Sequence, residues 1–311
     1  MDNKRLLIKL SKMYYEQNLS QKEISQEMNI SRPQISRFLQ KAREENIVTI
    51  RINDSYEDEA KLENQLKETF QLTDAVVINT VSDSREAELS EFGRVAANFL
   101  DTYINDGDIV GVMSGRTIFS LVQGVERFSR KGLKIVPLAG GLGSRNADWH
   151  ANTIAQNFAR SAKGSVAYML NAPSVMKSEA GRDLLLSEPD VSAVQKLGSV
   201  CDVAILGIGM IDNSASNVVA GALTEDEVLE LKNAGAVGSM CISYFNNQGV
   251  LLHPDIERRM IGQRLEAIQR VKKIALAIGN EKAEAVKAAL KTGFVDVFIT
   301  NMKTAQNILS K

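Results

Sequence analysis

Hydrophobic positions along the chain follow two different spacings. In about the first fifty residues they recur at helical intervals, so that Leu6, Leu10 and Met13 share one face of a first helix expected over Asn3–Gln17. From Ala75 onward, short apolar runs typical of buried strands alternate with longer stretches typical of helices. The sequence therefore predicts a helical N-terminal segment followed by a layered α/β fold with a largely parallel sheet.

Two more helices in the N-terminal segment are predicted from their capping residues. Ser20 precedes Glu23 by three positions, the spacing of a capping box, in which each side chain hydrogen-bonds the backbone of the other residue. Ser31 and Gln34 repeat this spacing and open the next helix. That helix is expected to bury the face made of Ile35, Phe38, Leu39 and Ala42. Two short capped helices joined by a tight turn form a helix-turn-helix pattern.

The opposite face of the last helix carries side chains that DNA-binding helices use. Arg can donate to guanine O6 and N7, Gln can pair with adenine, and Ser or Lys can contact phosphate oxygens. The residues predicted to bind DNA are Ser31, Arg32, Gln34, Ser36, Arg37 and Lys41. Because capping boxes also occur in three-helix bundles that bind no DNA, a plain bundle is the alternative interpretation.

The segment between the two parts predicts the domain boundaries. Ile47–Ile52 alternates as a short strand, and apolar residues at helical spacing predict a helix over Glu59–Phe70. The polar residues between them are expected to form a linker. The predicted domains are a helix-turn-helix DNA-binding domain over residues 1–53, a linker over 54–58, and an effector-binding and oligomerisation domain over 59–311.

The elements of the α/β part are predicted from its apolar runs. The expected strands are Ala75–Asn79, Ile109–Met113, Lys134–Leu138, Val166–Leu170, Val203–Gly207, Lys273–Ile278 and Val295–Thr300. The expected helices are Ser84–Tyr103, Thr117–Phe128, Trp149–Ala162, Leu223–Ala234 and Lys282–Lys291. Since ligands of such sheets bind beyond the carboxyl ends of the strands, a site is expected in the turns that follow them.

Four of these turns are rich in glycine. They are Ser114-Gly115-Arg116-Thr117, Ala139-Gly140-Gly141-Leu142-Gly143, Gly207-Ile208-Gly209 and Gly279-Asn280-Glu281-Lys282. Glycine lets the backbone approach an anion, amides at a helix N-terminus attract phosphate, and Arg116 and Lys282 add positive charge. Strand-to-helix turns also favour glycine for geometry alone, but four of them, two with a cation, predict a phosphorylated ligand. None matches GxxxxGK[ST] or GxGxxG, which disfavours nucleotide hydrolysis and dinucleotide binding.

Composition and charge exclude several classes of protein. The chain has 311 residues, 44% of them hydrophobic and 24% charged, which is an ordinary globular composition for about two domains. Its formal net charge is −1, although residues 1–54 carry +3 and the rest carry −4. Two cysteines and two histidines predict neither a disulfide scaffold nor a metal site, and no cofactor is expected. No stretch has the pattern of a transmembrane helix or a signal peptide, so a cytoplasmic protein is expected.

In these motifs the chain resembles the SorC family of sugar-responsive bacterial transcriptional regulators, which includes the deoxyribonucleoside regulator, the central glycolytic gene regulator and LsrR-like proteins. The matching segments are LSQKEISQEMNISRPQISRFLQKAREENIVTIRI, NDGDIVGVMSGRTI, PLAGGLG, DVAILGIG, SYFNNQG and GNEKAEAVKAALKTGFVDVFIT. The resemblance implies a helix-turn-helix head and a C-terminal α/β effector domain like the phosphosugar isomerases of the NagB and RpiA type. It also implies a homodimer or homotetramer that binds double-stranded operator DNA and a small phosphorylated sugar. No association with a membrane is expected.

The resemblance also implies effector contacts outside the glycine-rich turns. The full set of residues predicted to bind the effector is Ser114, Gly115, Arg116, Thr117, Gly140, Gly141, Gly143, Gly207, Gly209, Ser239, Phe245, Arg259, Gly279 and Lys282. Lys282 matches its family position. Arg259 matches a family arginine, although an arginine in such an acidic and basic loop is often only ion-paired.

Several positions depart from the family pattern. Ala139 stands where the deoxyribonucleoside regulator has the lysine that forms a Schiff base with its sugar, so covalent capture of the effector is not expected. Ser239 follows the Ala-Val-Gly tripeptide where an aspartate often holds a ligand hydroxyl. Ser243 replaces a usual arginine, and Asn301 replaces a usual aspartate. The residues that bind phosphate in the family are therefore better matched in this sequence than those that contact the sugar.

The function predicted from these features is that of a DNA-binding transcriptional regulator, expected to be a repressor, whose operator affinity is controlled by a phosphorylated sugar. It is not expected to be an enzyme. The alternative is a phosphosugar isomerase or deaminase, because a fold does not fix a function. An isomerase needs a positioned carboxylate or histidine as general base. The predicted turns offer mainly glycine, Ser, Thr, Arg and Lys, and the acids considered for this role are Asp148 and Asp255.

Overall fold

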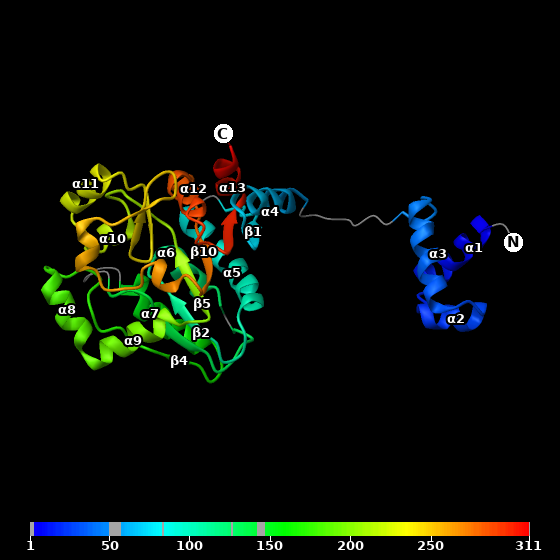
Figure 1. Cartoon of the computed structure of the whole chain (residues 1–311), viewed down its shortest axis with the longest axis horizontal. Coiled ribbons are helices and arrows are strands. Elements are labelled where there is room, and N and C mark those ends of the chain that lie inside the picture. The colour runs from blue at the N-terminus through cyan, green and yellow to red at the C-terminus, as the bar shows by residue number, and fades with distance from the viewer. Residues whose placement is uncertain (1–2, 50–56, 83, 126, 142–146, 311) are drawn as a thin grey trace. The chain divides into compact units, whose positions relative to one another are not determined.

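The computed structural model of the chain describes residues 3–49, 57–82, 84–125, 127–141 and 147–310. The chain divides into two units, Met1–Ser55 and Tyr56–Lys311, the first of which is blue in Figure 1. Helix α4 (Glu57–Phe70) belongs to the second unit, so residues 57 and 58 of the predicted linker are helical, whereas residues 54–56 lie outside the described part. No helix among the described residues is long and apolar enough to cross a bilayer.

The first unit consists of three packed helices. They are α1 (Asn3–Ser11), which continues as the π-helical turn η1 (Lys12–Glu16), α2 (Gln21–Met28) and α3 (Arg32–Glu44). Their buried core is made of Leu10, Met13, Ile24, Ile35 and Leu39. The strand predicted over residues 47–52 is wrong for residues 47–49, which form bends and coil because Ile47 and Val48 donate back to the end of α3; residues 50–52 lie outside the described part.

The second unit is built on a seven-stranded sheet in which all pairs are parallel. In spatial order the strands are β1 (Asp74–Ile78), β11 (Val297–Asn301), β10 (Lys272–Leu276), β5 (Val203–Gly207), β2 (Ile109–Val112), β3 (Lys134–Pro137) and β4 (Val166–Ala167). All seven predicted strands are present, although β4 is shorter than expected. The prediction of a largely parallel α/β fold is confirmed.

Helices cover both faces of this sheet (Figure 1). One face packs against α5 (Arg85–Tyr103), α6 (Arg116–Gln123) and α7 (Ala151–Ser161), and the other against α4, α12 (Ala283–Lys291) and α13 (Met302–Leu309). Successive strand residues serve opposite layers, as Ile205 and Leu206 do in β5. The sheet is therefore buried on both sides, which explains why its strands are nearly continuous apolar runs.

The sequence prediction missed a second set of elements. These are the helices α8 (Glu179–Ser187), α9 (Pro189–Ser199) and α10 (Ser216–Val219), and the antiparallel sheet of β6 (Gly209–Met210), β7 (Gly238–Met240), β8 (Ser243–Phe245) and β9 (Leu251–Leu252). The predicted helix near residue 225 is present as α11 (Glu225–Asn233). Short 3₁₀ turns are η2 (Ala147–Trp149), η3 (Asp255–Arg259), η4 (Glu266–Ile268) and η5 (Asn280–Lys282). Strands of two or three residues are too short to show an alternating pattern.

Candidate functional site

A cavity of about 120 Å³ lies in the second unit, at the carboxyl ends of the central strands. The turns after β2 and β5 form part of its wall, and Lys282, in the turn after β10, forms another part. β2 and β5 are neighbours, but the chain continues from β2 to β3 on one side and from β5 to β10 on the other. This change of direction is the place where open α/β sheets bind ligands.

The structure brings eight of the fourteen predicted effector residues to this cavity. They are Ser114, Gly115, Arg116, Thr117, Gly207, Gly209, Ser239 and Lys282. Five others, Gly140, Gly141, Phe245, Arg259 and Gly279, do not line it, and Gly143 lies outside the described residues. Residues from all four glycine-rich turns thus line one cavity, since Ala139 belongs to the turn that holds Gly140 and Gly141.

Lys282 is the cation with the most favourable position. It ends η5, immediately before α12, and its backbone N–H donates to Gly279 O at 3.1 Å. Its side chain is half-buried and forms no hydrogen bond or ion pair within the described part of the chain. Burial, together with the nearby cations Arg85 and Arg116, lowers the pKa of Lys282 to about 8. An anionic group in the cavity would reverse this effect by supplying the missing counter-charge.

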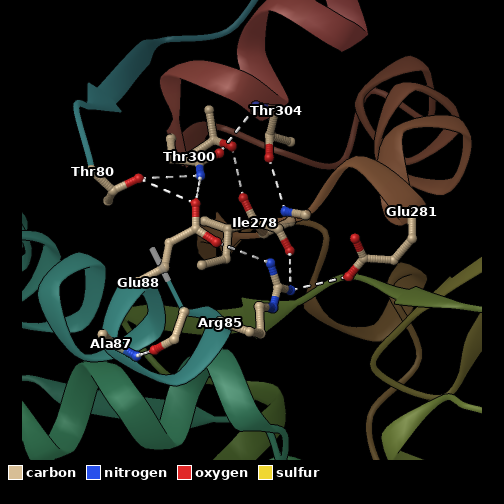
Figure 2. Close-up of polar contacts among 12 residues, drawn as sticks. Thr80, Arg85, Ala87, Glu88, Ile278, Glu281, Thr300 and Thr304 are labelled. Atoms are coloured by element: carbon tan, nitrogen blue, oxygen red, sulfur yellow. Dashed lines mark hydrogen bonds and ion pairs between the residues drawn. The ribbon is translucent and has the colours of Figure 1, made fainter. Parts of the chain in front are cut away.

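A network of polar side chains holds the Lys282 turn in place (Figure 2). Arg85, from the first turn of α5, donates to Ile278 O at 2.9 Å and to Glu281 Oε1 at 3.1 Å. Gly279 N donates to Thr304 Oγ1 at 2.9 Å, which ties the turn to α13. Because Glu281 is paired with Arg85, it does not neutralise Lys282 by an ion pair. The network thus fixes the turn while leaving its lysine free.

Asn301 belongs to the same network, and its environment explains one departure from the family pattern. Asn301 Nδ2 donates to Glu88 Oε1 at 2.7 Å, while its Oδ1 accepts from Thr304 N at 3.0 Å and caps α13. An asparagine amide can donate to the carboxylate and accept from the backbone at once, whereas an ionised aspartate can only accept. Asparagine therefore fits opposite Glu88, where an aspartate would place two carboxylates in contact.

Arg116 begins α6 beside the cavity. Its guanidinium carbon lies 5.4 Å from the centroid of the Trp149 ring, a cation–π contact, and Gly115 N donates to Trp149 O at 2.9 Å. Gly115 has φ +134°, which a side chain rarely permits, so the sharp entry into the helix requires glycine. The Arg116 side chain is exposed and is held at the rim of the cavity by the indole.

Gly140 and Gly141 have a structural role that differs from the predicted one. Their backbone N–H groups donate to Ile261 O at 3.0 Å and to Ala172 O at 2.8 Å, so they are not available to an anion. A Cβ on Gly140 would lie 2.5 Å from Pro173 O. Glycine is therefore needed there for the close passage of a neighbouring chain segment. The preceding residue, Ala139, lines the cavity instead.

Phe245 and Ser243 are turned into the core. Phe245 is fully buried and would collide with any Cβ on Gly238, while its neighbour Tyr244 lines the cavity. Ser243 Oγ accepts from Leu265 N at 3.0 Å in the buried interior, so the position where the family usually has an arginine is here part of the core. The prediction of a Phe245 contact with the effector is therefore not supported by its position.

Arg259 and Gly279 stabilise the segments around the cavity and do not line it. Arg259 Nη2 pairs with Glu227 Oε1 at 2.7 Å and its Nη1 donates to Met176 O at 3.0 Å, so the ion-paired alternative describes it correctly. This pair contributes to holding the pKa of Glu227 below its usual value, against the opposing effect of burial. Gly279, with φ +120°, shapes the Lys282 turn without reaching the cavity.

Several cavity residues had no recognisable signal in the sequence. They are Ser174, Val175, Ala215, Ser216, Asn217, Ala222, Leu223, Cys241, Ile242, Tyr244 and Met260, besides residues adjacent to the predicted turns. They come from the loop after β4, the segment around α10, the small antiparallel sheet with its β7–β8 turn, and the end of η3. No glycine-rich strand end marks these segments, so only tertiary packing brings them to the site.

The chemical character of the cavity argues against catalysis of isomerisation. The described residues that line it include no Asp, Glu or His, so none of them can serve as the usual general base. The described residues also contain no group of three or more His, Cys, Asp or Glu side chains arranged to hold a metal ion. The lining is mostly apolar, with hydroxyl groups and the two cations Arg116 and Lys282. Such a wall suits binding of a small anionic ligand with hydroxyl groups.

In the first unit, all six residues predicted to bind DNA are exposed on α3 or at its start. The apolar face is turned inward, with Ile35, Leu39 and Ala42 buried as predicted and Phe38 only half-buried. Ser31 N and Oγ both donate to Gln34 Oε1, at 3.3 Å and 2.8 Å, so the Gln34 carbonyl is occupied by the cap. Its amide NH₂ group is not used in this cap.

This architecture was compared with known protein families and their members. Residues 54–310 match the family model described as "Putative sugar-binding domain". The sorbitol operon regulator of Klebsiella pneumoniae is 29% identical, with 99% of this chain and 98% of that protein covered. The deoxyribonucleoside regulator of Bacillus subtilis is 27% identical, with the same coverage of 99% and 98%.

Solved structures agree with these relatives. The full-length sorbitol operon regulator SorC from Klebsiella pneumoniae matches with a TM-score of 0.73 and 28% identity, covering 100% of both chains. A DeoR family transcriptional regulator from Listeria monocytogenes matches with a TM-score of 0.74 and 28% identity, covering 81% of this chain and 99% of that one. These relatives are regulators rather than enzymes, which decides between the two functions considered. The chain belongs to the SorC family of transcriptional regulators with a sugar-binding domain.

Proposed function

We propose that this regulator is a repressor that binds operator DNA through α3 and releases it when a phosphorylated sugar enters the cavity of the second unit. The observation that carries the proposal is Lys282, a cation without an ion-pair partner among the described residues, set at a glycine-containing turn beside a cavity whose described lining contains one other cation, Arg116, and no acidic residue. A phosphate there would receive a charge-assisted hydrogen bond from the ammonium group. The sugar hydroxyls would meet Ser114, Thr117 and Ser239.

The DNA end of the mechanism rests on α3. Its exposed Arg32, Arg37 and Lys41 provide positive charge, and the unit as a whole carries the basic excess of the chain. We assign base contacts to Arg37 and the Gln34 amide, and phosphate contacts to the serines and Lys41. We propose that the protein acts in the cytoplasm, as a homodimer or homotetramer.

Titration calorimetry with a panel of sugar phosphates tests the effector site. For the panel member that binds best, Lys282→Ala should weaken binding about tenfold to a hundredfold, because a hydrogen bond to a charged group contributes about 1.5–3 kcal/mol. Lys303→Ala removes an exposed lysine from the first turn of α13 and should bind as the wild type does. Equal affinity of the Lys282→Ala and wild-type proteins would exclude this site.

A gel-shift assay on the DNA upstream of the protein's own gene tests repression. The unliganded protein should shift this DNA, and the sugar phosphate that binds best should release it. Lys282→Ala should still bind the DNA without effector but should need a higher effector concentration for release. DNA binding that requires the effector would show an activator-like response and would contradict the proposed direction of control.

A further inference from the structure

Ser174 stands out among the residues that line the cavity. Its side chain is only 4% exposed, and its Oγ is buried without a hydrogen-bond partner in the described part of the chain. Buried hydroxyl groups are nearly always paired, because an unpaired one has lost its bonds to water without replacement. An unpaired hydroxyl at the wall of a binding cavity therefore indicates a partner that is supplied from outside the protein.

The backbone around Ser174 is fixed on both sides. Its N–H donates to Gly141 O at 2.8 Å, and its carbonyl accepts from Ile261 N at 2.9 Å. The next residue, Val175, forms a bridge with Met260. Because these bonds hold the main chain, the hydroxyl can change its direction only by rotation of the side chain. The position of Ser174 is thus set before a ligand binds.

A second buried serine shows what a purely structural hydroxyl does in this protein. Ser243 is 2% exposed, and its Oγ accepts from Leu265 N at 3.0 Å. Ser243 is therefore satisfied within the core, whereas Ser174 is equally buried but has no such bond. The contrast shows that a hydroxyl as deeply buried as that of Ser174 can be satisfied within this fold, and that the one at the cavity wall is not.

In the strand order of the sheet, Ser174 and Lys282 lie on opposite sides of the turns that follow β2 and β5. Lys282 follows β10, whereas Ser174 follows β4 and pairs with the segment after β3. The turns after β5 and β2 lie between them in the strand order. A ligand with its anionic group at Lys282 would therefore direct its neutral part toward Ser174, along apolar residues such as Ala139 and Ile242.

We propose that Ser174 is a specificity-determining residue that hydrogen-bonds a hydroxyl group in the neutral part of the effector. This assignment rests on the proposed function, because it takes Lys282 as the anion end. A serine hydroxyl can both donate and accept, as a sugar hydroxyl can, so the pair is complementary in either direction. The ligand class is a sugar or polyol phosphate, and a phosphate carrying an apolar tail would leave Ser174 unpaired.

Calorimetric titration of the full-length protein with Ser174→Ala tests the assignment. The probes are inorganic phosphate, ribose 5-phosphate, fructose 6-phosphate and glucitol 6-phosphate, together with the deoxy analogues of whichever sugar phosphate binds best. Ser174→Ala should weaken binding of that sugar phosphate about three- to tenfold and leave binding of inorganic phosphate unchanged. The deoxy analogue that lacks the contacted hydroxyl should bind both proteins equally.

Thermal unfolding of the free proteins separates recognition from packing. Ser174→Ala removes an unpaired hydroxyl and should unfold at the wild-type temperature or above it. Ser243→Ala removes a satisfied core hydrogen bond and should unfold at a lower temperature, with wild-type affinity for the sugar phosphate. A lower unfolding temperature for Ser174→Ala, without a change in affinity, would identify a structural serine and overturn the assignment.

The two proposals fail in different ways. If the wild-type protein binds no sugar phosphate of the panel but still binds operator DNA, the proposed effector class is wrong and the assignment of Ser174 is wrong with it. If the wild type binds a sugar phosphate and Ser174→Ala binds every probe equally well, only the assignment of Ser174 is overturned.

Discussion

Lys282 shows how a single residue can be prepared for an anion. Its ammonium group is half-buried beside two arginines, and no described carboxylate pairs with it, so its pKa is lowered to about 8. The neighbouring Glu281 could have paired with it but is engaged by Arg85. A phosphate dianion would raise this pKa again, which couples ligand binding to the protonation of the lysine.

This coupling predicts a pH dependence of effector binding. With a pKa of about 8 in the free protein, Lys282 is charged at pH 7 and mostly neutral at pH 9. Since a bound dianion raises this pKa, binding above pH 8 must take up a proton, and affinity should fall by up to about tenfold per pH unit. Calorimetry at pH 7, 8 and 9 in buffers of different ionisation enthalpy measures both the affinity and the proton uptake. Lys282→Arg should lose the dependence; an unchanged wild-type affinity up to pH 9 would contradict the prediction.

Asn301 gives a second residue-scale prediction. Asn301→Asp would place a carboxylate against Glu88 in a site where residue 301 is 1% exposed, at a contact now 2.7 Å long. Repulsion raises the pKa of the carboxyl pair above its unfolded value, so the variant should lose about 1–3 kcal/mol of stability at pH 7 and regain part of it as the pH falls toward 5. Chemical denaturation at both pH values measures this. Asn301→Ala, which removes the hydrogen bond without adding a charge, should show no such recovery.

At the scale of elements, three chain segments hydrogen-bond to one another beside the cavity. The segments after β3, after β4 and before η4 form a small ladder through Gly140, Ser174 and Ile261, and this ladder makes one wall of the cavity. The backbone amides of Gly140 and Gly141 donate to carbonyl groups of the other two segments, so this pair of glycines connects the three segments.

The close packing of this ladder predicts that adding one methyl group at Gly140 lowers the stability of the protein. Gly140→Ala would place Cβ 2.5 Å from Pro173 O, a backbone atom that cannot move without breaking neighbouring hydrogen bonds. Overpacking of this kind costs about 1–3 kcal/mol. Thermal unfolding should show the loss, and effector affinity should fall because the wall carrying Ser174 shifts. Gly207→Ala, where Cβ has ordinary contacts at 3.7 Å, should keep the wild-type unfolding temperature; a similar loss at both positions would contradict the ladder's role.

Helix α3 predicts different outcomes for its two exposed cations. Arg37→Ala should cost about 1–3 kcal/mol on the operator and relax the preference at one base position, because Arg is assigned to a base edge. Lys41, which is half exposed and already paired with Glu45 at 3.5 Å, is assigned to phosphate, so Lys41→Ala should weaken all sequences nearly equally. Competition gel shifts with operator variants distinguish the two. An unchanged operator affinity for Arg37→Ala would place the recognition surface elsewhere.

At the scale of the whole molecule, one small DNA-binding unit is joined to a much larger ligand-binding unit. A three-helix unit contacts few base pairs, so useful operator affinity requires two such units on one duplex. The predicted operator is an inverted repeat whose half-sites are separated by an integral number of turns, about 10 bp each. Sedimentation with and without this DNA measures the assembly. Tight operator binding by a protein that remains monomeric at micromolar concentration would contradict the prediction.

The sequence by itself determined the elements whose signals are local. Capping residues and helical spacing located α2 and α3, and buried apolar runs located every strand of the parallel sheet, because both depend on neighbouring residues. The rule that ligands bind at strand ends then placed Ser114–Thr117, Gly207 and Lys282 at one site. Motif order along the chain was enough to indicate the family.

Tertiary structure alone decided which of the candidate residues face the cavity. Gly140 and Gly141 resemble the other glycines in sequence, but their amides are taken by distant segments. Arg259 lies toward Glu227 rather than toward the cavity, and Ser174 reaches the wall from a loop with no sequence signal. The direction of a side chain and the occupancy of a backbone amide depend on partners tens to hundreds of residues away, which local pattern does not encode.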